Sequence, residues 1–214
     1  MCFSLHMSFF AAGLLTSIGI LALRKVTHRS HIPLASLPLI FAAQQAAEGM
    51  LWLLLPTDSY PLLITFSKYV FLGIATIVWP LFIPFTLLLI EPQSIRRALL
   101  AGCLIIAMGW SLAALWYAIQ YGAIAEIRQC HMYYAFFNNE TNVILQGITY
   151  CVTTLAPFFI SSNHSIRILG GLITGACIIT YIVWYSYFVS VWCFFAALLS
   201  MVIYRIISTK PLTQ

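Results

Sequence analysis

Charged residues are scarce in this sequence, and their scarcity excludes a water-soluble protein. Only 7% of the 214 residues are Asp, Glu, Lys or Arg, while 62% are hydrophobic and the mean hydropathy is +0.98. Soluble domains have about 25% charged residues and about 45–50% apolar residues. So few charges cannot cover a surface that faces water. We therefore predict an integral membrane protein.

Long polar segments are missing as well, which excludes a separate soluble domain. The apolar runs follow one another closely from one end of the chain to the other. We predict a single integral membrane domain over residues 1–214. The formal net charge of +5 is then a signal of membrane topology and does not indicate a nucleic acid partner.

Cysteine motifs are also lacking. The six cysteines form no CxxC pair and do not have the spacing of a disulfide framework. Most of them fall within apolar runs, where cysteine behaves as a small hydrophobic residue. Cys2 and Cys130 are the two that we expect to reach an aqueous face.

The apolar runs predict an all-α fold, a polytopic bundle of seven membrane-spanning helices. A bilayer core of roughly 30 Å needs about 20 apolar residues of helix. The runs that fit this length cover residues 7–23, 34–55, 66–90, 98–120, 143–161, 168–186 and 188–206. In the third run Pro80 and Pro84 each remove a backbone donor, so we expect that helix to bend.

The positions of the basic residues predict the orientation of the bundle. With the N-terminus outside, the outer side keeps only Lys68 and Arg128. The inner side then holds the other Lys and Arg residues, which are Arg24, Lys25, Arg29, Arg96, Arg97, Arg167, Arg205 and Lys210. Cytoplasmic loops of membrane proteins carry such an excess. We predict an outer N-terminus and an inner C-terminus.

The second span contains three polar side chains that are expensive to bury in a bilayer, Gln44, Gln45 and Glu48. Their spacing of three and four residues puts them on one helix face, and Trp52 continues this face outward. With a rise of about 1.5 Å per residue, the two glutamines lie about 15 Å from the inner end of the helix. We expect Glu48 in the outer third.

Two interpretations of Glu48 remain open. In the first it is a paired or protonated carboxylate that orders the packing of the helices. In the second it is a proton carrier, a metal ligand or a general base in an outward-facing cavity. Lys68, near the outer end of the third span and at a comparable height, is the expected salt-bridge partner. Gln146 lies in the outer half of the fifth span.

A metal site is a further hypothesis for the outer side. Cys130 and His131 stand together in the loop before the fifth span, and Cys2 and His6 lie near the N-terminus. Thiolate and imidazole ligands favour copper or zinc. A disulfide between Cys2 and Cys130 is equally economical, because both would face an oxidising compartment.

The opening Met1-Cys2-Phe3-Ser4 and the sequence Gln44-Gln45-Ala46-Ala47-Glu48 resemble a family of bacterial multi-pass membrane proteins. Its members begin Met-Cys-Phe-Ser and carry a His/Gln-Gln-x-x-Glu motif in the second helix, where many have histidine at the position of Gln44. The resemblance is clearest over roughly the first 55 residues. It implies a bacterial inner membrane and highlights Cys2, Gln45 and Glu48, but it implies no activity.

The leading functional prediction is an outward-facing polar pocket, centred on Glu48, that binds and translocates or processes a small molecule or metal ion. Gln44, Gln45, Trp52, Lys68 and Gln146 would line this pocket. One alternative is a membrane-embedded enzyme with Glu48 and His131 as its acid–base pair, because histidine titrates near neutral pH. Another is a non-catalytic sensor or assembly subunit.

Overall fold

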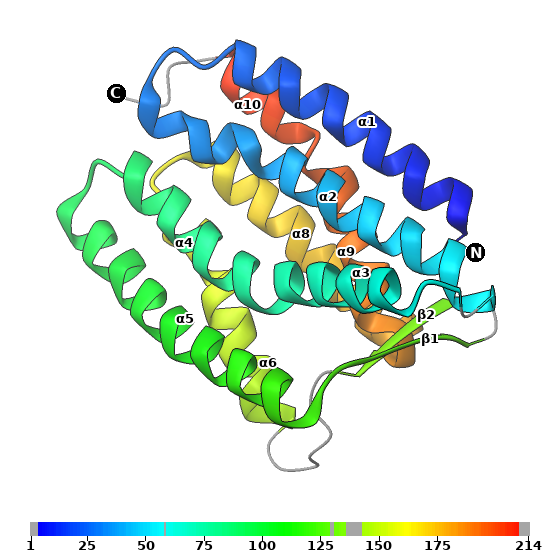
Figure 1. Cartoon of the computed structure of the whole chain (residues 1–214). Helices are drawn as coiled ribbons and strands as arrows, with labels where there is room; N and C mark the ends of the chain where they lie inside the picture. Colours follow the sequence, from blue (N-terminus) through cyan, green and yellow to red (C-terminus); the bar gives the residue numbers. More distant parts are fainter. Residues whose placement is uncertain (1–3, 58, 129–130, 136–142, 210–214) are drawn as a thin grey trace.

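The computed structural model describes residues 4–57, 59–128, 131–135 and 143–209, which are almost entirely helical (Figure 1). The first half contains α1 (Leu5–Arg24), η1 (Arg29–His31), α2 (Ile32–Leu54), η2 (Leu55–Thr57), α3 (Pro61–Gly73), the π-helical turn η3 (Ile74–Val78), α4 (Trp79–Ile90) and α5 (Ser94–Tyr121). A hairpin of β1 (Ile124–Arg128) and β2 (His131–Ala135) follows. The chain continues with α6 (Val143–Thr154), α7 (Ala156–Ile160), α8 (His164–Val183), η4 (Tyr185–Tyr187), α9 (Phe188–Leu199) and α10 (Val202–Thr209).

Six helical segments in the described part of the chain are long and apolar enough to cross a membrane, which indicates a multi-pass membrane protein. They are Leu5–Arg24, Arg29–Thr57, Pro61–Ile90, Ser94–Tyr121, His164–Val183 and Tyr185–Ser208. They correspond to six of the seven predicted spans. The predicted span 143–161 is instead divided at Leu155 into α6 and α7.

The division at Leu155 has a local cause in the sequence. The hydroxyls of Thr153 and Thr154 donate to the carbonyls of Thr149 and Tyr150, four residues back, at 2.9 and 2.6 Å. Such bonds compete with the helix and often bend it. Pro157 then lacks the N–H that would continue the ladder. Hydropathy alone does not reveal either effect.

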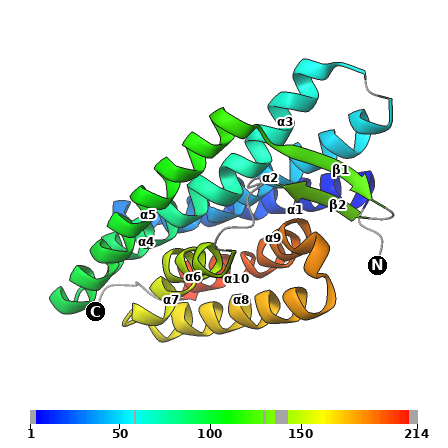
Figure 2. The ribbon, with the colours of Figure 1, turned by 90° about the horizontal axis from the view of Figure 1, so that it is seen from below.

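The α2 helix is the centre of the bundle. It packs against α1, α3, α4, α9 and α10, and Figure 2 shows it between α3–α5 on one side and α8–α10 on the other. In its most apolar window 61% of the residues are buried, against 22–50% in the other five segments. The polar residues of the second span therefore lie on the helix that is farthest from lipid.

The pairing of α1 with α2 depends on two glycines. A Cβ atom at Gly19 would lie 2.6 Å from the side chain of Leu39, and one at Gly49 would lie 3.0 Å from the ring of Phe9. Small residues let membrane helices approach closely. Gly49 thus brings α1 against α2 directly beside Glu48.

The predicted bend of the third span is present as the π-helical turn η3, where the direction of the helix changes (Figure 1). The Trp79 N–H donates to the carbonyl of Ile74, five residues back, and Pro80 has no N–H to continue the ladder. Side chains from other helices donate to three consecutive carbonyls of this turn. Tyr150 Oη donates to Ala75 O (2.9 Å), Trp110 Nε1 to Thr76 O (2.8 Å) and Ser111 Oγ to Ile77 O (3.5 Å).

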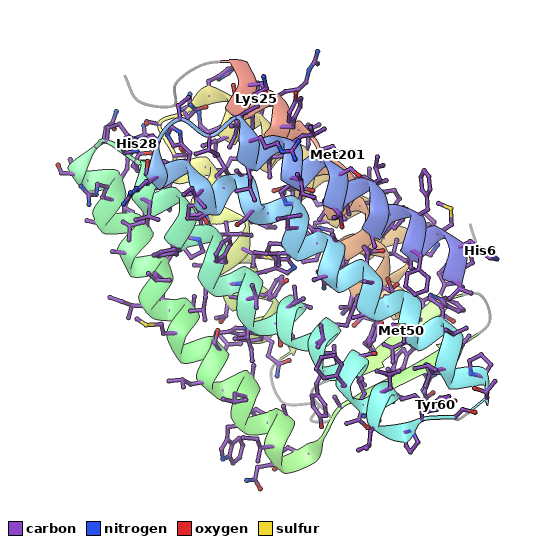
Figure 3. The ribbon with its side chains drawn as sticks, turned by 45° about the horizontal axis from the view of Figure 1, so that its top comes forward. His6, Lys25, His28, Met50, Tyr60 and Met201 are labelled. Atoms are coloured by element: carbon purple, nitrogen blue, oxygen red, sulfur yellow. The ribbon has the colours of Figure 1, made fainter. Side chains whose placement is uncertain are left out.

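The two ends of the bundle differ in structure. The hairpin end carries the start of α1, the end of α2 and the antiparallel β1–β2 pair; the basic end carries the loop between α1 and α2. Figure 3 shows His6, Met50 and Tyr60 towards the hairpin end and Lys25 and His28 at the basic end. Along β2 burial alternates, so that Met132 and Tyr134 face the helices.

Candidate functional site

The polar face of α2 lies inside the protein. Gln44 and Gln45 have no exposed surface, and Glu48 is 2% exposed. They lie on the helix that contacts the largest set of neighbouring elements, so each side chain meets a different group of them. The predicted common face is therefore present, but its three members have different surroundings.

Gln44 connects α2 to three other elements. Its Oε1 accepts a hydrogen bond from Trp79 Nε1 at 2.9 Å, and its Nε2 donates to Phe71 O at 3.4 Å and to Cys193 Sγ at 3.3 Å. These bonds use the acceptor and both donors of the amide. Gln44 therefore joins α2 to α3, α4 and α9, and it has no donor left for a ligand.

Among the described residues, the hydrogen-bond donor to Glu48 is the hydroxyl of Ser190 on α9, 2.5 Å from Glu48 Oε1. Tyr134 of the hairpin and Gln45 are the other polar side chains that interact with the carboxyl group. Neither of them reaches hydrogen-bond geometry. Three separate elements, α9, β2 and α2 itself, thus surround this group.

The expected salt bridge between Glu48 and Lys68 does not form in the described part of the chain, where the ion pair is Arg128–Glu126. The Lys68 ammonium instead lies 5.3 Å from the ring centre of Tyr69, next to it in the sequence. Lys68 lies in the middle of α3, where its side chain is half-exposed. A cation over an aromatic face is stabilised without leaving water completely.

The hairpin contributes Tyr134, rather than His131, to the surroundings of Glu48. Successive strand residues point to opposite faces, and His131 stacks on Tyr187 of η4 with ring centres 4.5 Å apart. Tyr134 stacks on Phe71 of α3 at 4.3 Å. Burial lowers the pKa of His131 below its usual value.

Tyr134 remains a neutral phenol at physiological pH. Burial raises the pKa of Tyr134 well above its ordinary value, and the neighbouring Glu48 raises it further. A phenol that keeps its proton can donate a hydrogen bond to a carboxylate or to a ligand. The hairpin therefore places a hydrogen-bond donor against the buried carboxyl group.

The other residues predicted to line the pocket, Gln45, Trp52 and Gln146, differ in their surroundings. The indole N–H of Trp52 and both amide atoms of Gln45 are buried without a hydrogen-bond partner among the described residues. Gln146 of α6 is half-buried, and α6 packs mainly against α4, α5 and α7. Gln45 and Trp52 therefore carry buried polar atoms without partners among the described residues, whereas Gln146 is half-buried.

The residues predicted to bind metal do not meet in the described structure. Cys2 and Cys130 lie outside the described residues, His6 is exposed on α1 and His131 packs on Tyr187. Within the described residues there is no group of three or more His, Cys, Asp or Glu side chains that could hold a metal ion. Copper or zinc binding therefore has no support from the described part of the chain.

Glu91 shows what a structural carboxylate looks like in this protein. It is 4% exposed, and its two oxygens accept backbone N–H groups, from Gln93 at 3.4 Å and from Ser162 at 2.8 Å. Backbone donors hold this carboxylate at the basic end and join α4 to the loop before α8. Glu48 is buried to the same degree, but no backbone N–H among the described residues donates to it.

Comparison with known proteins gives the family. Residues 1–214 match DUF6629, a family of unknown function. The chain belongs to the DUF6629 family. No curated protein and no solved structure matches it. The match covers the whole chain, so the matched region contains α9 as well as the α2 motif.

Sequence reasoning missed Ser190, Cys193 and Tyr134 in this DUF6629 protein. Ser190 and Cys193 are three residues apart on α9, one helical turn, and they bond Glu48 and Gln44, which are one turn apart on α2. The sequence does contain one signal for these two residues, a serine and a cysteine at i and i+3 in an apolar run. This spacing does not show that α9 packs against α2, because that contact joins helices far apart in the sequence.

Proposed function

We propose that this protein binds a small ligand at Glu48 and carries it across the membrane, with exchange of a proton at the Glu48 carboxyl group. The observation that carries the proposal is the burial of Glu48 with one hydroxyl donor and, among the described residues, no cation within ion-pair distance. A carboxylate in a membrane bundle needs a proton or a cation to balance it. Ligand binding can supply or displace either one.

Unused polar groups beside the carboxyl group support the binding of a small polar ligand. Among the described residues, the Gln45 amide, the Trp52 indole N–H and the Tyr134 hydroxyl are buried without hydrogen-bond partners. Each such group costs about 1–3 kcal/mol when it is left unpaired. Contacts with a ligand would offset this cost at one place in the bundle.

The irregular helix next to the site supports transport over a purely structural role. Gln44, one turn from Glu48, binds the carbonyl of Phe71 just before η3. Membrane transporters place interrupted helices at their binding sites because freed backbone groups and changes of direction are tolerated there. The α3–η3–α4 segment has this character.

The proposed topology follows the sequence prediction. The divided segment α6–α7 would supply a seventh crossing, so that the two chain ends lie on opposite sides of the membrane. The hairpin end would face outward and the basic end would face the cytoplasm of a bacterial cell. Glu48 would then be reached from outside.

Infrared difference spectroscopy tests whether Glu48 exchanges a proton. Full-length protein in lipid nanodiscs is compared in acidic and alkaline buffer. We expect a carboxylic acid C=O band that titrates with pH in the wild type and is absent in Glu48→Gln. Glu91→Gln is the matched control, because Glu91 is equally buried, and it should keep the band.

Proteoliposomes test the transport step with protons as the probe. A membrane potential is imposed with potassium and valinomycin, and a pH-sensitive dye reports the interior. We expect proton uptake above that of empty liposomes for the wild type and Glu91→Gln, and uptake like that of empty liposomes for Glu48→Gln. A wild type that matches empty liposomes and shows no titrating band would refute the proposal.

The short Ser190–Glu48 contact favours a second candidate, a serine hydrolase or acyltransferase. Ser190 Oγ donates directly to a carboxylate that could act as its general base. A fluorophosphonate probe should then label the wild type and not Ser190→Ala. Labelling that persists in Ser190→Ala, or no labelling at all, would exclude this candidate.

A further inference from the structure

Oxygen atoms from several elements meet at the Glu48 carboxyl group. Ser190 Oγ lies 2.5 Å from Glu48 Oε1, and Gln45 and Tyr134 are the other polar side chains that interact with this group. Together these four side chains can present a carboxylate, two hydroxyl oxygens and an amide oxygen. They come from α2, β2 and α9, which are far apart in the sequence. The fold therefore brings together a set of oxygen ligands.

Two members of this set have lone pairs that the described part of the protein does not use. Both amide atoms of Gln45 and the hydroxyl of Tyr134 are buried without a hydrogen-bond partner among the described residues. Gln45 has no exposed surface, and Tyr134 is 9% exposed. Because neither end of the Gln45 amide is bonded there, turning its oxygen towards Glu48 breaks no hydrogen bond of the described structure. A bound cation would satisfy both oxygens at once.

The charge of the site favours a monovalent cation. Glu48 is 2% exposed, and among the described residues no cation lies within ion-pair distance of it. One monovalent cation balances one carboxylate, whereas a divalent cation would leave a net positive charge inside the membrane, which is costly. Hard cations prefer oxygen ligands, while copper and zinc favour sulfur and nitrogen. The ligand set thus has the chemistry of an alkali metal site.

Close packing around the carboxyl group favours an ion over a larger ligand. The ring of Tyr134 is held by its stacking on Phe71, with ring centres 4.3 Å apart. Beside Glu48, a Cβ atom at Gly49 would lie 3.0 Å from the ring of Phe9, so α1 closes the adjacent side of α2. Sodium is smaller than potassium and is therefore better suited to closely spaced oxygens, since selectivity among hard cations depends on the size of the site.

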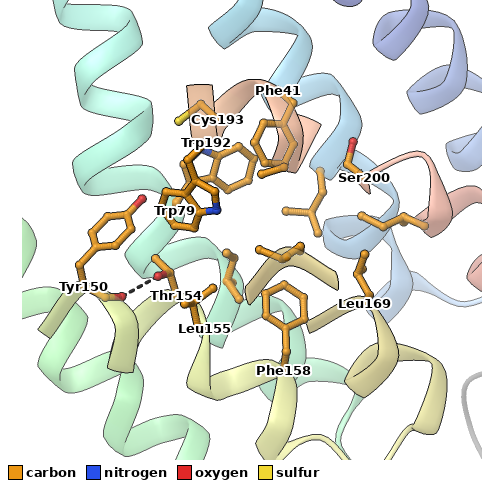
Figure 4. A pocket seen from close by; sticks show the side chains of 15 residues that line it. Phe41, Trp79, Tyr150, Thr154, Leu155, Phe158, Leu169, Trp192, Cys193 and Ser200 are labelled. Carbon is orange, nitrogen blue, oxygen red and sulfur yellow. Dashed lines mark hydrogen bonds between the residues drawn. The ribbon is translucent and has the colours of Figure 1, made fainter. Parts of the chain in front are cut away.

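The cavity in the basic half of the bundle has a different chemistry. It has a volume of about 40 Å³ and is lined by α2, α4, α6–α7, α8, α9 and α10. Figure 4 shows aromatic and aliphatic side chains around it, among them Phe41 and Trp79. The Thr154 hydroxyl on its wall donates to Tyr150 O at 2.6 Å, the bond drawn in the figure. No carboxylate is among the described residues that line it. The oxygens that suit a cation are at Glu48.

We propose that Glu48 binds a sodium ion together with Ser190, Gln45 and Tyr134. The inference rests on the proposed function, because it names the small ligand that is exchanged for a proton at Glu48. A proton and a sodium ion carry the same charge, so either one balances the buried carboxylate. The Ser190 hydroxyl donates to the carboxyl group in the ion-free structure, and it turns a lone pair to the ion when sodium binds.

Binding of radioactive sodium to the purified full-length protein tests the proposal. Protein in nanodiscs is kept in choline chloride buffer, and bound sodium is measured by scintillation proximity. We expect saturable binding to the wild type that unlabelled sodium chloride displaces and extra choline chloride does not. Glu48→Gln should abolish this binding. Glu91→Gln should keep it, because Glu91 is equally buried but lies at the basic end.

A second pair of variants keeps the test decisive if Glu48→Gln does not fold. Tyr134→Phe removes one ligand oxygen and keeps the ring that stacks on Phe71, so we expect the affinity for sodium to fall at least several-fold. Tyr133→Phe is the matched control, because Tyr133 is the preceding residue on β2 and points to the opposite face. It should bind sodium like the wild type.

The outcomes separate this inference from the proposed function. Wild-type protein without saturable sodium binding, or Tyr134→Phe protein that binds sodium like the wild type, would overturn the sodium site. If the infrared and proteoliposome experiments in sodium-free buffer still showed proton exchange, the proposed function would stand without it. Saturable sodium binding without a titrating carboxylic acid band would support the sodium site and refute proton exchange.

Discussion

At the scale of single residues, the two adjacent glutamines of α2 have different roles. Consecutive helix residues are turned by about 100° from each other, so Gln44 and Gln45 meet different neighbours. Gln44 uses its whole amide on Trp79, Phe71 and Cys193. Gln45 is equally buried and has no hydrogen-bond partner in the described structure. We infer that Gln44 holds the helices together and that Gln45 is available to a ligand.

Replacing Gln44 should therefore change stability more than binding. Gln44→Leu leaves Trp79 Nε1 without an acceptor inside the bundle, and we expect a loss of about 1 kcal/mol, since hydrogen bonds between membrane helices contribute about 0.6–1.7 kcal/mol. Gln44→His keeps a ring nitrogen as acceptor and should lose less. Unfolding in mixed micelles, followed by tryptophan fluorescence, measures both.

Gln45→Leu provides the comparison for this prediction. It removes an amide that has no hydrogen-bond partner in the described structure, so we expect stability equal to or above that of the wild type. A larger loss for Gln45→Leu than for Gln44→Leu would contradict the division of roles. It would mean that Gln45 has a structural hydrogen bond in the membrane.

At the scale of helices and strands, the π-helical turn is a stabilised feature of the fold. Three consecutive carbonyls, of Ala75, Thr76 and Ile77, accept hydrogen bonds from side chains of α5 and α6. In a bilayer, backbone groups freed by proline must find such partners. The two prolines were visible in the sequence and predicted the bend. The partners, 34 to 75 residues away, were not.

A double-mutant cycle should show that Tyr150 replaces the missing donor of Pro80. Tyr150→Phe removes the hydroxyl that binds Ala75 O, and we expect a loss of about 0.6–1.7 kcal/mol. In Pro80→Ala the new N–H lies five residues after Ala75, in the same register as the Trp79–Ile74 bond, so Tyr150→Phe should cost less there. Unfolding free energies in mixed micelles give the coupling energy.

Tyr185→Phe is the matched control for this cycle. Tyr185 is exposed on η4 and lies far from η3 in the sequence, so its hydroxyl should contribute close to nothing. Equal losses for Tyr150→Phe in both backgrounds would show that the two groups act independently. The π turn would then have another origin.

The hairpin is a part of the fold whose secondary structure hydropathy did not predict. The sequence predicts a loop after the fourth span, and it favours His131 there because histidine titrates near neutral pH. The strand period of two instead turns Met132 and Tyr134 inward and His131 towards Tyr187. Hydropathy marks where a chain leaves the membrane, but it does not show which loop residues fold back against the helices.

At the scale of the whole molecule, composition and span length predicted most of the architecture. Six of the seven predicted spans correspond to long apolar helices, because about 20 apolar residues are a strong signal. The face of Gln44, Gln45 and Glu48 was also predicted, since it depends only on helical periodicity. Which elements surround that face depends on packing between distant helices. Ser190, Cys193 and Tyr134 therefore required the structure.

The arrangement of charge at the two ends of the bundle leads to the last prediction, the orientation in the membrane. Lys25 and His28 lie at one end, and His6 and Tyr60 lie towards the other (Figure 3). Because basic loops stay in the cytoplasm, the hairpin end should face outward.

Single cysteines at Ser59, near the hairpin end, and Ser94, at the basic end, are exposed probes of the two sides. Both are placed in a chain without native cysteines and treated with a membrane-impermeant maleimide. We expect Ser59→Cys to react in intact cells and Ser94→Cys only after permeabilisation. The reverse pattern would place Glu48 nearer the cytoplasm and would require ligand entry from inside.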